Sequence, residues 1–306
     1  MSDRVRQIAQ AVLYEGYLLW PYRRSAAKNR HRFTIGGLYP ASYAAHFGDR
    51  ARARFSLLVE GRDPSFDFEV RFLHVVRRQA YRDGAPVDEL SVGDARHLSW
   101  DEAAEEAVEL GAPALPLDAP VVREARRDEE VLAPGAVLRR SRERLDGRLS
   151  ARTEFAGDGR VRLFVELANE SDWDGLGREE ALRRTFAAAH VVVRVRDGAF
   201  VSPLDDPGAL CEGLWPALVG APGSRDAVLA SAVILGDYPA VAPESPGDLF
   251  DGGEIDELLI HSIRALTDEE RREMRDTDAR AREILERSLA LAPEQLERLH
   301  GAFRDG

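Results

Sequence analysis

The acidic stretch from Glu244 to Glu257 holds the densest set of groups that could do chemistry in this 306-residue chain. Six carboxylates fall within its fourteen residues, around the pair Gly252-Gly253. Hard cations such as Ca²⁺ prefer clustered oxygen ligands on bent loops, so Asp248, Asp251 and Glu254 are candidate metal ligands. The spacing differs from that of an EF-hand, and acidic residues before a helix also oppose the positive end of its dipole. The dipole interpretation is the simpler one, and we expect no bound cofactor.

The seven histidines and the single cysteine give little support to catalysis. No two histidines are spaced three to five residues apart, which removes the usual helical zinc pattern. His74 and His190 stand among apolar residues of strand-like segments, where a structural histidine is the simpler interpretation. Cys211 has apolar neighbours and is interpreted as a small buried hydrophobe. A sole cysteine permits no disulfide within the chain, which is compatible with a reducing compartment.

Residues 14–30 combine aromatic with basic side chains and include the only lysine, so their chemistry is that of recognition. Tyrosine, tryptophan and arginine contribute most of the binding energy at many protein interfaces. In a second interpretation, favoured about equally, the aromatic rings cap the core and the arginines pair with carboxylates of the same chain. The candidate partner-binding residues are Tyr17, Trp20, Tyr22, Arg23, Lys28, Asn29 and Arg30.

Net charge and hydropathy exclude two classes of partner. A formal net charge of −12 repels the nucleic-acid polyanion, so we expect no nucleic-acid binding. No apolar run approaches the roughly 20 residues that cross a bilayer, so we expect no membrane insertion. A cytoplasmic protein is the resulting expectation.

In the first half of the chain, apolar spacing predicts an N-terminal helix within residues 3–19. Pro40 and Gly48 bracket a predicted loop, residues 41–47. Residues 54–60 and 66–77 predict strands, the second by its alternation of apolar and charged side chains. Residues 98–110 are ambiguous, and their Ala- and Glu-rich composition slightly favours a helix. The proline-rich residues 111–120 predict a connector or a sheet-edge crossing, because proline donates no ladder hydrogen bond.

In the second half, alternation predicts a series of strands, including a hairpin that joins residues 149–155 to 160–169 through Gly157-Asp158-Gly159. Helices follow at 255–266, with Thr267 capping the next segment, and at 279–291. The fold class is therefore α+β, with a mainly antiparallel β-sandwich-like core, an N-terminal helix and a C-terminal helical cluster. Residues 1–250 form the β-rich domain, and residues 251–306 form a helical segment packed on it.

Two stretches resemble an uncharacterised bacterial family encoded in uptake [NiFe]-hydrogenase gene clusters. They are Tyr14-Glu15-Gly16-Tyr17-Leu18-Leu19-Trp20-Pro21-Tyr22-Arg23 with Lys28-Asn29-Arg30, and Asp237-Tyr238-Pro239 through Asp251 with Glu254 to Leu258. The resemblance runs nearly end to end. It implies an accessory role in assembling or maturing a hydrogenase through contacts with a hydrogenase subunit or maturation factor. It implies no activity for any particular residue.

The leading functional expectation is thus a non-enzymatic accessory or interaction protein. One alternative is a metal-binding or hydrolytic enzyme that uses the acidic loop 244–257, joined in space by His31 or His46 and the Tyr22 hydroxyl. Another is a small-molecule- or carbohydrate-binding β-sandwich that uses Trp100 or Trp173.

Overall fold

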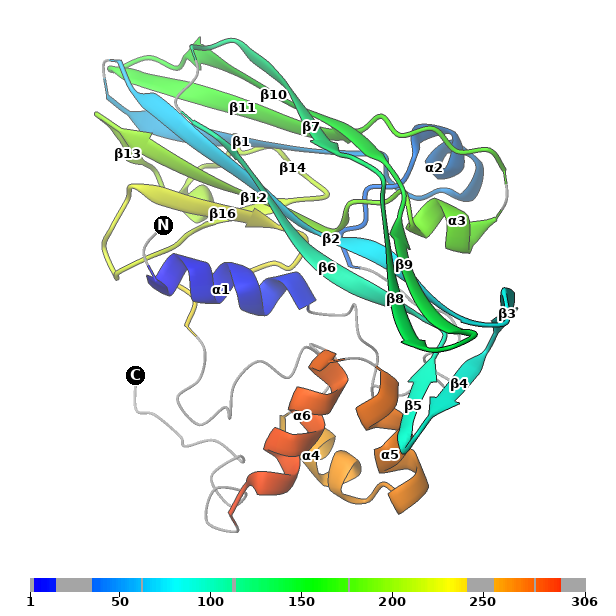
Figure 1. Ribbon diagram of the computed structural model, residues 1–306. Coiled ribbons are helices and arrows are strands. Elements are labelled where there is room, and N and C mark those ends of the chain that lie inside the picture. Colours follow the sequence, from blue (N-terminus) through cyan, green and yellow to red (C-terminus); the bar gives the residue numbers. More distant parts are fainter. Residues whose placement is uncertain are drawn as a thin grey trace.

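Two antiparallel β-sheets, packed face to face, make up the core of the protein (Figure 1). The computed structural model describes residues 3–14, 35–61, 63–111, 114–175, 177–240, 256–277 and 279–292. The predicted α+β class with a sandwich-like core is confirmed.

The smaller sheet, which we call the β1 sheet, has the strand order β13-β1-β11-β10-β7, with β14 also paired to β1. Its longest ladders join β10 to β11, through the predicted turn at Gly157-Asp158-Gly159, and β11 to β1. The predicted hairpin is therefore confirmed. The strands are β1 (Arg52–Glu60), β7 (Leu117–Arg123), β10 (Leu145–Phe155), β11 (Arg160–Asn169), β13 (Ala199–Phe200) and β14 (Cys211–Glu212).

The larger sheet, the β2 sheet, has the order β15-β16-β12-β2-β9-β8, with β3 and β6 also paired to β2. Strand β2 is 18 residues long and is the only strand of this sheet that pairs with four others among the described residues. The strands are β2 (Ser65–Arg82), β3 (Ala85–Val87), β6 (Trp100–Leu110), β8 (Arg126–Ala133), β9 (Ala136–Arg142), β12 (Ala187–Arg196), β15 (Trp215–Leu218) and β16 (Ala227–Ser231), and a separate ladder joins β4 (Glu89–Val92) to β5 (Ala95–Leu98).

The core between the sheets is built mainly from alternate residues of β1, β2, β10, β11, β12 and β16, as a pleated strand requires. On β2 these residues are Phe66, Phe68, Val70 and Phe72, which pack with Leu57 and others of the β1 sheet in one cluster. The intervening residues of β2 point to the other face, called here the outer face of the β2 sheet.

Helices cover that outer face in two places. Helix α1 (Asp3–Tyr14) places Val5, Ile8 and Val12 against Val192 and Leu229 of the sheet. The C-terminal helices α4 (Asp256–Arg264), α5 (Asp268–Thr277) and α6 (Ala279–Ala290) pack in a second cluster that includes residues of β2 and β12. Both sets lie on the same side of the sandwich (Figure 1).

The predicted cap of helix α5 is confirmed. The backbone N–H of Glu270 donates to the Thr267 hydroxyl at 3.3 Å, and the Thr267 N–H donates to the Glu270 carboxylate at 2.9 Å. These reciprocal hydrogen bonds form a capping box, which satisfies amides that the helix itself leaves unpaired.

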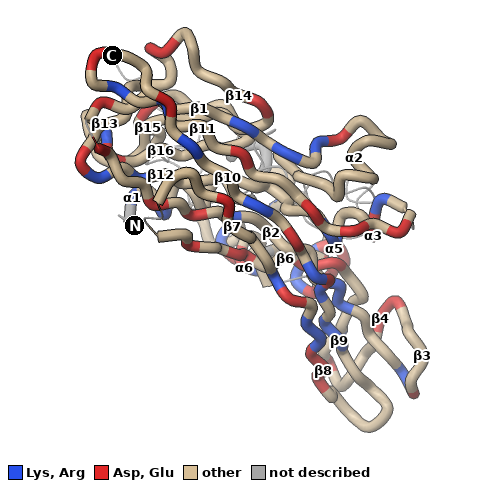
Figure 2. Tube along the Cα trace, turned by 90° about the horizontal axis from the view of Figure 1, so that it is seen from above, with Lys and Arg blue, Asp and Glu red and all other residues tan. Residues whose placement is uncertain are grey.

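The helix predicted at residues 98–110 is wrong, because this segment forms strand β6. It pairs with β2 along all eleven of its residues, from Phe68 opposite Leu110 to Arg78 opposite Trp100. Two of its glutamates form ion pairs with arginines of neighbouring strands: Glu106 with Arg123 and Arg142, and Glu102 with Arg78 and Arg140. Figure 2 shows acidic and basic residues interspersed along the strands of this region.

The loop predicted at residues 41–47 is also wrong, because these residues form the short helix α2 (Ala41–Phe47). Pro40 stands just before it, and Gly48 ends it with a left-handed conformation at φ 78°. Proline and glycine at these places start and stop a helix as readily as they bracket a loop. Burial of Tyr43 and Ala44 stabilises this short helix.

The proline-rich segment ends in β7, which contains Pro120 and lies at the edge of the β1 sheet, as the sequence predicts for proline. The predicted N-terminal helix is observed as α1, which is described up to Tyr14.

Candidate ligand-binding site

The sites predicted from sequence fall outside the described residues and stay predictions. This holds for the partner-binding set Tyr17, Trp20, Tyr22, Arg23, Lys28, Asn29 and Arg30, and for the metal-ligand set Asp248, Asp251 and Glu254. Within the described ranges, no group of three or more His, Cys, Asp or Glu side chains could hold a metal ion.

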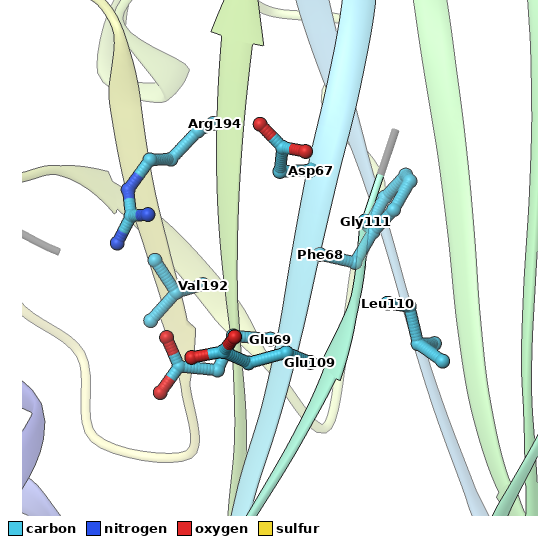
Figure 3. Close-up of a pocket in the computed structure, with 8 residues that line it drawn as sticks. All are labelled: Asp67, Phe68, Glu69, Glu109, Leu110, Gly111, Val192 and Arg194. Carbon is cyan, nitrogen blue, oxygen red and sulfur yellow. The ribbon is translucent and has the colours of Figure 1, made fainter. Parts of the chain in front are cut away.

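A pocket of about 240 Å³ lies on the outer face of the β2 sheet, where strands β12, β2 and β6 run side by side. Its charged lining comes from Asp67 and Glu69 of β2, Glu109 of β6 and Arg194 of β12. Figure 3 shows Glu69 and Glu109 extending in the same direction, toward Val192, with the Arg194 guanidinium on the far side of that valine. Phe68, Leu110 and Gly111 complete the lining.

The strand register explains how these residues meet. Arg194 stands opposite Asp67 and Val192 opposite Glu69 on the β12–β2 ladder, and Glu69 stands opposite Glu109 on the β2–β6 ladder. Directly opposed side chains on one face of a sheet lie about 5 Å apart at Cβ. Glu109 thus stands beside Glu69 as a second carboxylate at this end of the pocket.

Two of the three pocket carboxylates already have cationic partners. Asp67 pairs with Arg196 at 3.1 Å, and Glu69 pairs with Arg71 at 3.1 Å. Arg194 and Glu109 make no ion pair with any residue that the structure describes, and Arg194 Nη2 is buried with no hydrogen-bond acceptor among them. The pocket thus presents a buried, unpaired Nη2 of Arg194 and an exposed carboxylate, Glu109, that has no ion-pair partner among the described residues.

Buried polar residues next to the pocket hold Glu69 in place. Arg71, 8% exposed, donates to Glu69 Oε1 and also to Gln10 Oε1 of α1 at 3.0 Å. His190 stands opposite Arg71 on β12, and its Nδ1 lies 3.2 Å from the Ala188 carbonyl oxygen. Burial, together with the nearby positive charge of Arg71, lowers the pKa of His190 to about 3, so this imidazole is neutral at pH 7.

His74 is the second buried histidine. Burial lowers its pKa to about 4, and the positive charge of Arg142 acts in the same direction. Arg142 and Arg123 both bind the Glu106 carboxylate, which is only 15% exposed. The sequence interpretation of His74 and His190 as structural residues left core and surface positions open, and the structure places both completely inside.

Acidification from pH 7 to pH 4.5 should destabilise the protein through these two histidines. In the unfolded chain each takes up a proton near pH 6.5, whereas in the folded protein they stay neutral down to about pH 4 and about pH 3. Their contribution is fully present above pH 6.5 and is lost as the pH falls below it. At about 1.4 kcal/mol per pKa unit, each should cost roughly 2–3 kcal/mol of unfolding free energy at pH 4.5, measured by urea denaturation.

The His190→Gln variant isolates this effect from the protonation of carboxylates. It should lose about half of the histidine-dependent decrease between the two pH values, whereas His46→Gln, at an exposed position, should keep the decrease of the wild type. An identical pH dependence in His190→Gln and the wild type would contradict the burial argument.

Cys211 and the two candidate tryptophans lie away from the residues that line the pocket. Burial raises the pKa of the half-buried Cys211 thiol, and the nearby Asp206 charge adds to this, which disfavours the thiolate. Trp100 belongs to β6 and is half-buried. Trp173 is also half-buried, packed edge-on against Tyr43 with ring centroids 5.2 Å apart. Sugar stacking needs an exposed indole face, and both of these indoles are half-buried.

No family model matches this chain, and no curated protein matches it. Among solved structures, it aligns with the secretin InvG of the Salmonella SPI-1 type III secretion injectisome in its open-gate state, at 11% identity and a TM-score of 0.15. The alignment covers 62% of this chain and 60% of the secretin chain, so this chain spans less than two thirds of that structure. A likeness at that TM-score carries no functional argument, so the geometry of the pocket is the main guide to function.

Proposed function

We propose that this chain is a non-enzymatic binding protein whose ligand site is the pocket on the outer face of the β2 sheet. The observation that carries the proposal is the unmatched pair of charges, Arg194 and Glu109, in a cavity of about 240 Å³. A buried donor without an acceptor costs about 1–3 kcal/mol, and a bound anion would remove that cost.

The chemistry of the lining favours binding over reaction. A general acid or base works best with a pKa near the operating pH. The nearest histidine, His190, instead has a pKa of about 3. It stands opposite Arg71, which is ion-paired with Glu69. The pocket side chains are suited to holding a charged molecule in place by guanidinium and carboxylate contacts.

A panel of small charged molecules, screened by ligand-observed NMR, tests this function. We expect ligands that bind the wild type to lose their binding in the double variant Glu109→Gln/Arg194→Gln. The matched control is Glu105→Gln, which changes an exposed glutamate of the same strand outside the pocket lining and should bind as the wild type does. Equal binding by the double variant and the wild type would refute the proposal.

A second candidate function is the accessory role toward a [NiFe]-hydrogenase, exerted in the cytoplasm through protein contacts. The supporting observation is an aromatic surface on α2, where Phe47 is 55% exposed and packs against Tyr43, with ring centroids 4.6 Å apart. Trp173 borders the same rings at 6.3 Å from Phe47. Exposed aromatic side chains on a packed base are typical anchors of protein interfaces.

Affinity purification from the native cell tests this second role. A tagged wild-type chain should retrieve a hydrogenase subunit or maturation factor, and Trp20→Ala/Tyr22→Ala should retrieve none while remaining folded by circular dichroism. Failure to retrieve any hydrogenase component, with hydrogen uptake intact in a deletion strain, would reject it.

A further inference from the structure

We propose that the pocket on the outer face of the β2 sheet binds a small zwitterion, a molecule with one ammonium and one carboxylate group. This inference rests on the proposed function, because it names the ligand class of the same site. Its charge argument begins with the three carboxylates and one guanidinium of the lining. Arg196 and Arg71 neutralise Asp67 and Glu69, which leaves Glu109 and Arg194 as one charge of each sign.

The two unmatched groups are placed to hold opposite ends of one ligand. Glu109 belongs to β6 and Arg194 to β12, and β2 runs between them. Neighbouring strands are about 4.8 Å apart, so the two backbones are separated by about 10 Å. The residues make no direct ion pair in the structure, and a ligand with both charges would bridge the gap.

The anionic end of the ligand belongs at Arg194. This side chain extends away from Asp67, although Asp67 stands directly opposite on the neighbouring strand (Figure 3). Its Nη2 is consequently buried without an acceptor among the described residues. A carboxylate is the group whose geometry best matches the two parallel donors of a guanidinium.

The cationic end belongs at the Glu69–Glu109 pair. Glu109 has no ion-pair partner among the described residues, and Glu69, held in place by Arg71, stands directly opposite it on the next strand. An ammonium group supplies three donors and a compact positive charge, enough to contact both carboxylates. Val192 lies between the two ends, with its side chain packed against α1 (Figure 3).

The size of the pocket limits the ligand to about the dimensions of a single amino acid. A volume of about 240 Å³ corresponds to the share of about eight water molecules in the liquid. Drug-sized molecules need about 300 Å³ or more. An aliphatic amino acid with its amine on the terminal carbon would fit and would span more distance than an α-amino acid.

Calorimetric titration of the full chain with glycine, β-alanine, 4-aminobutyrate and 6-aminohexanoate tests the inference. Butylamine and butyrate serve as probes that carry only one of the two charges. We expect at least one amino acid of the series to bind about tenfold or more tightly than either single-charge probe, with the best chain length reporting the spacing between Arg194 and the glutamate pair.

Three variants test which residue binds each end of the ligand. Arg194→Gln should reduce the affinity of the best amino acid to that of butylamine, and Glu109→Gln should reduce it to that of butyrate, each a loss of about tenfold or more. Glu105→Gln should leave it unchanged. Matching thermal unfolding of the three variants and the wild type shows that a loss reflects the pocket and not the fold.

The outcomes separate the inference from the function on which it depends. If butylamine or butyrate binds as tightly as every amino acid, and the affinity still depends on a pocket residue, the zwitterion is rejected and the ligand site stands. If no probe binds and the wider charged panel also finds no ligand sensitive to Glu109→Gln/Arg194→Gln, both are rejected.

Discussion

The Phe72→Ala variant should lose about 3–5 kcal/mol of unfolding free energy, a large part of the stability of a typical domain. Phe72 is completely buried between the sheets, and its ring meets that of Phe186 edge-on at a centroid distance of 4.7 Å. Phe186 in turn lies over Gly147 of β10, where an added Cβ would come within 2.6 Å of the ring. Removal of the Phe72 ring therefore opens a cavity that the surrounding close-packed groups cannot fill.

Urea denaturation at pH 7 gives this loss directly, and Phe155→Ala provides the matched control. Phe155 lies at the end of β10 with 81% of its surface exposed, so its truncation should change the unfolding free energy by no more than about 0.5 kcal/mol. Similar losses in the two variants would contradict the placement of the core between the sheets.

The Arg78→Met variant should lose about 3–5 kcal/mol, because Arg78 joins three separate elements while only 7% exposed. Its Nη1 donates to Glu102 of β6 at 2.7 Å, and its Nε donates to the Leu98 carbonyl oxygen of β5 at 2.9 Å. Its Nη2 donates to the carbonyl oxygen of Thr277, the last residue of α5. Methionine keeps much of the aliphatic stem but leaves the Glu102 charge and these carbonyls with fewer partners.

Limited proteolysis extends this test to the C-terminal helices. Cleavage within α4–α6 should become faster in Arg78→Met, since the variant loses the contact of β2 with the end of α5. Arg126→Met is the control, because the Arg126–Asp128 ion pair has both side chains more than half exposed and should contribute less than about 1 kcal/mol. Equal unfolding free energies of Arg78→Met and Arg126→Met would show that the buried contacts of Arg78 do not stabilise the protein.

The alternation of apolar and polar residues along the sequence was sufficient to predict most strands of the sandwich. In β2, charged residues alternate with Phe66, Phe68, Val70 and Phe72, and this pattern directly reflects one face turned to the core. The hairpin at residues 157–159 was predictable for a similar reason, because glycine supplies the positive φ that its tight turn needs.

Strand β6 shows why composition alone misleads. Its alanines and glutamates favour a helix in isolation, and intrinsic propensity is a weak preference that tertiary contacts override. Here the contacts are eleven paired residues on β2 and the arginines that bind Glu102 and Glu106. Those arginines lie on β2, β7 and β9, so no pattern within residues 98–110 could include them.

The pocket was likewise outside the reach of sequence reasoning. Glu69, Glu109 and Arg194 lie far apart along the chain, and only the pairing of β6 and β12 with β2 brings them to one face. The signal available in advance was the run Asp67, Glu69 and Arg71 on one side of a strand whose other side is apolar from Phe66 to Phe72. A charged face of that kind indicates a solvated surface as readily as a site, so the prediction needed the neighbouring strands.

Strand β2 also sets a fixed length within the molecule. Glu69 lines the pocket, and Arg78 contacts the end of α5. The two residues are nine positions apart on this uninterrupted strand, so at 3.3 Å per residue their backbones are about 30 Å apart. Hydrogen bonds to neighbouring strands prevent this segment from folding back or stretching. The pocket and the contact of Arg78 with α5 are therefore held at a fixed separation of about 30 Å.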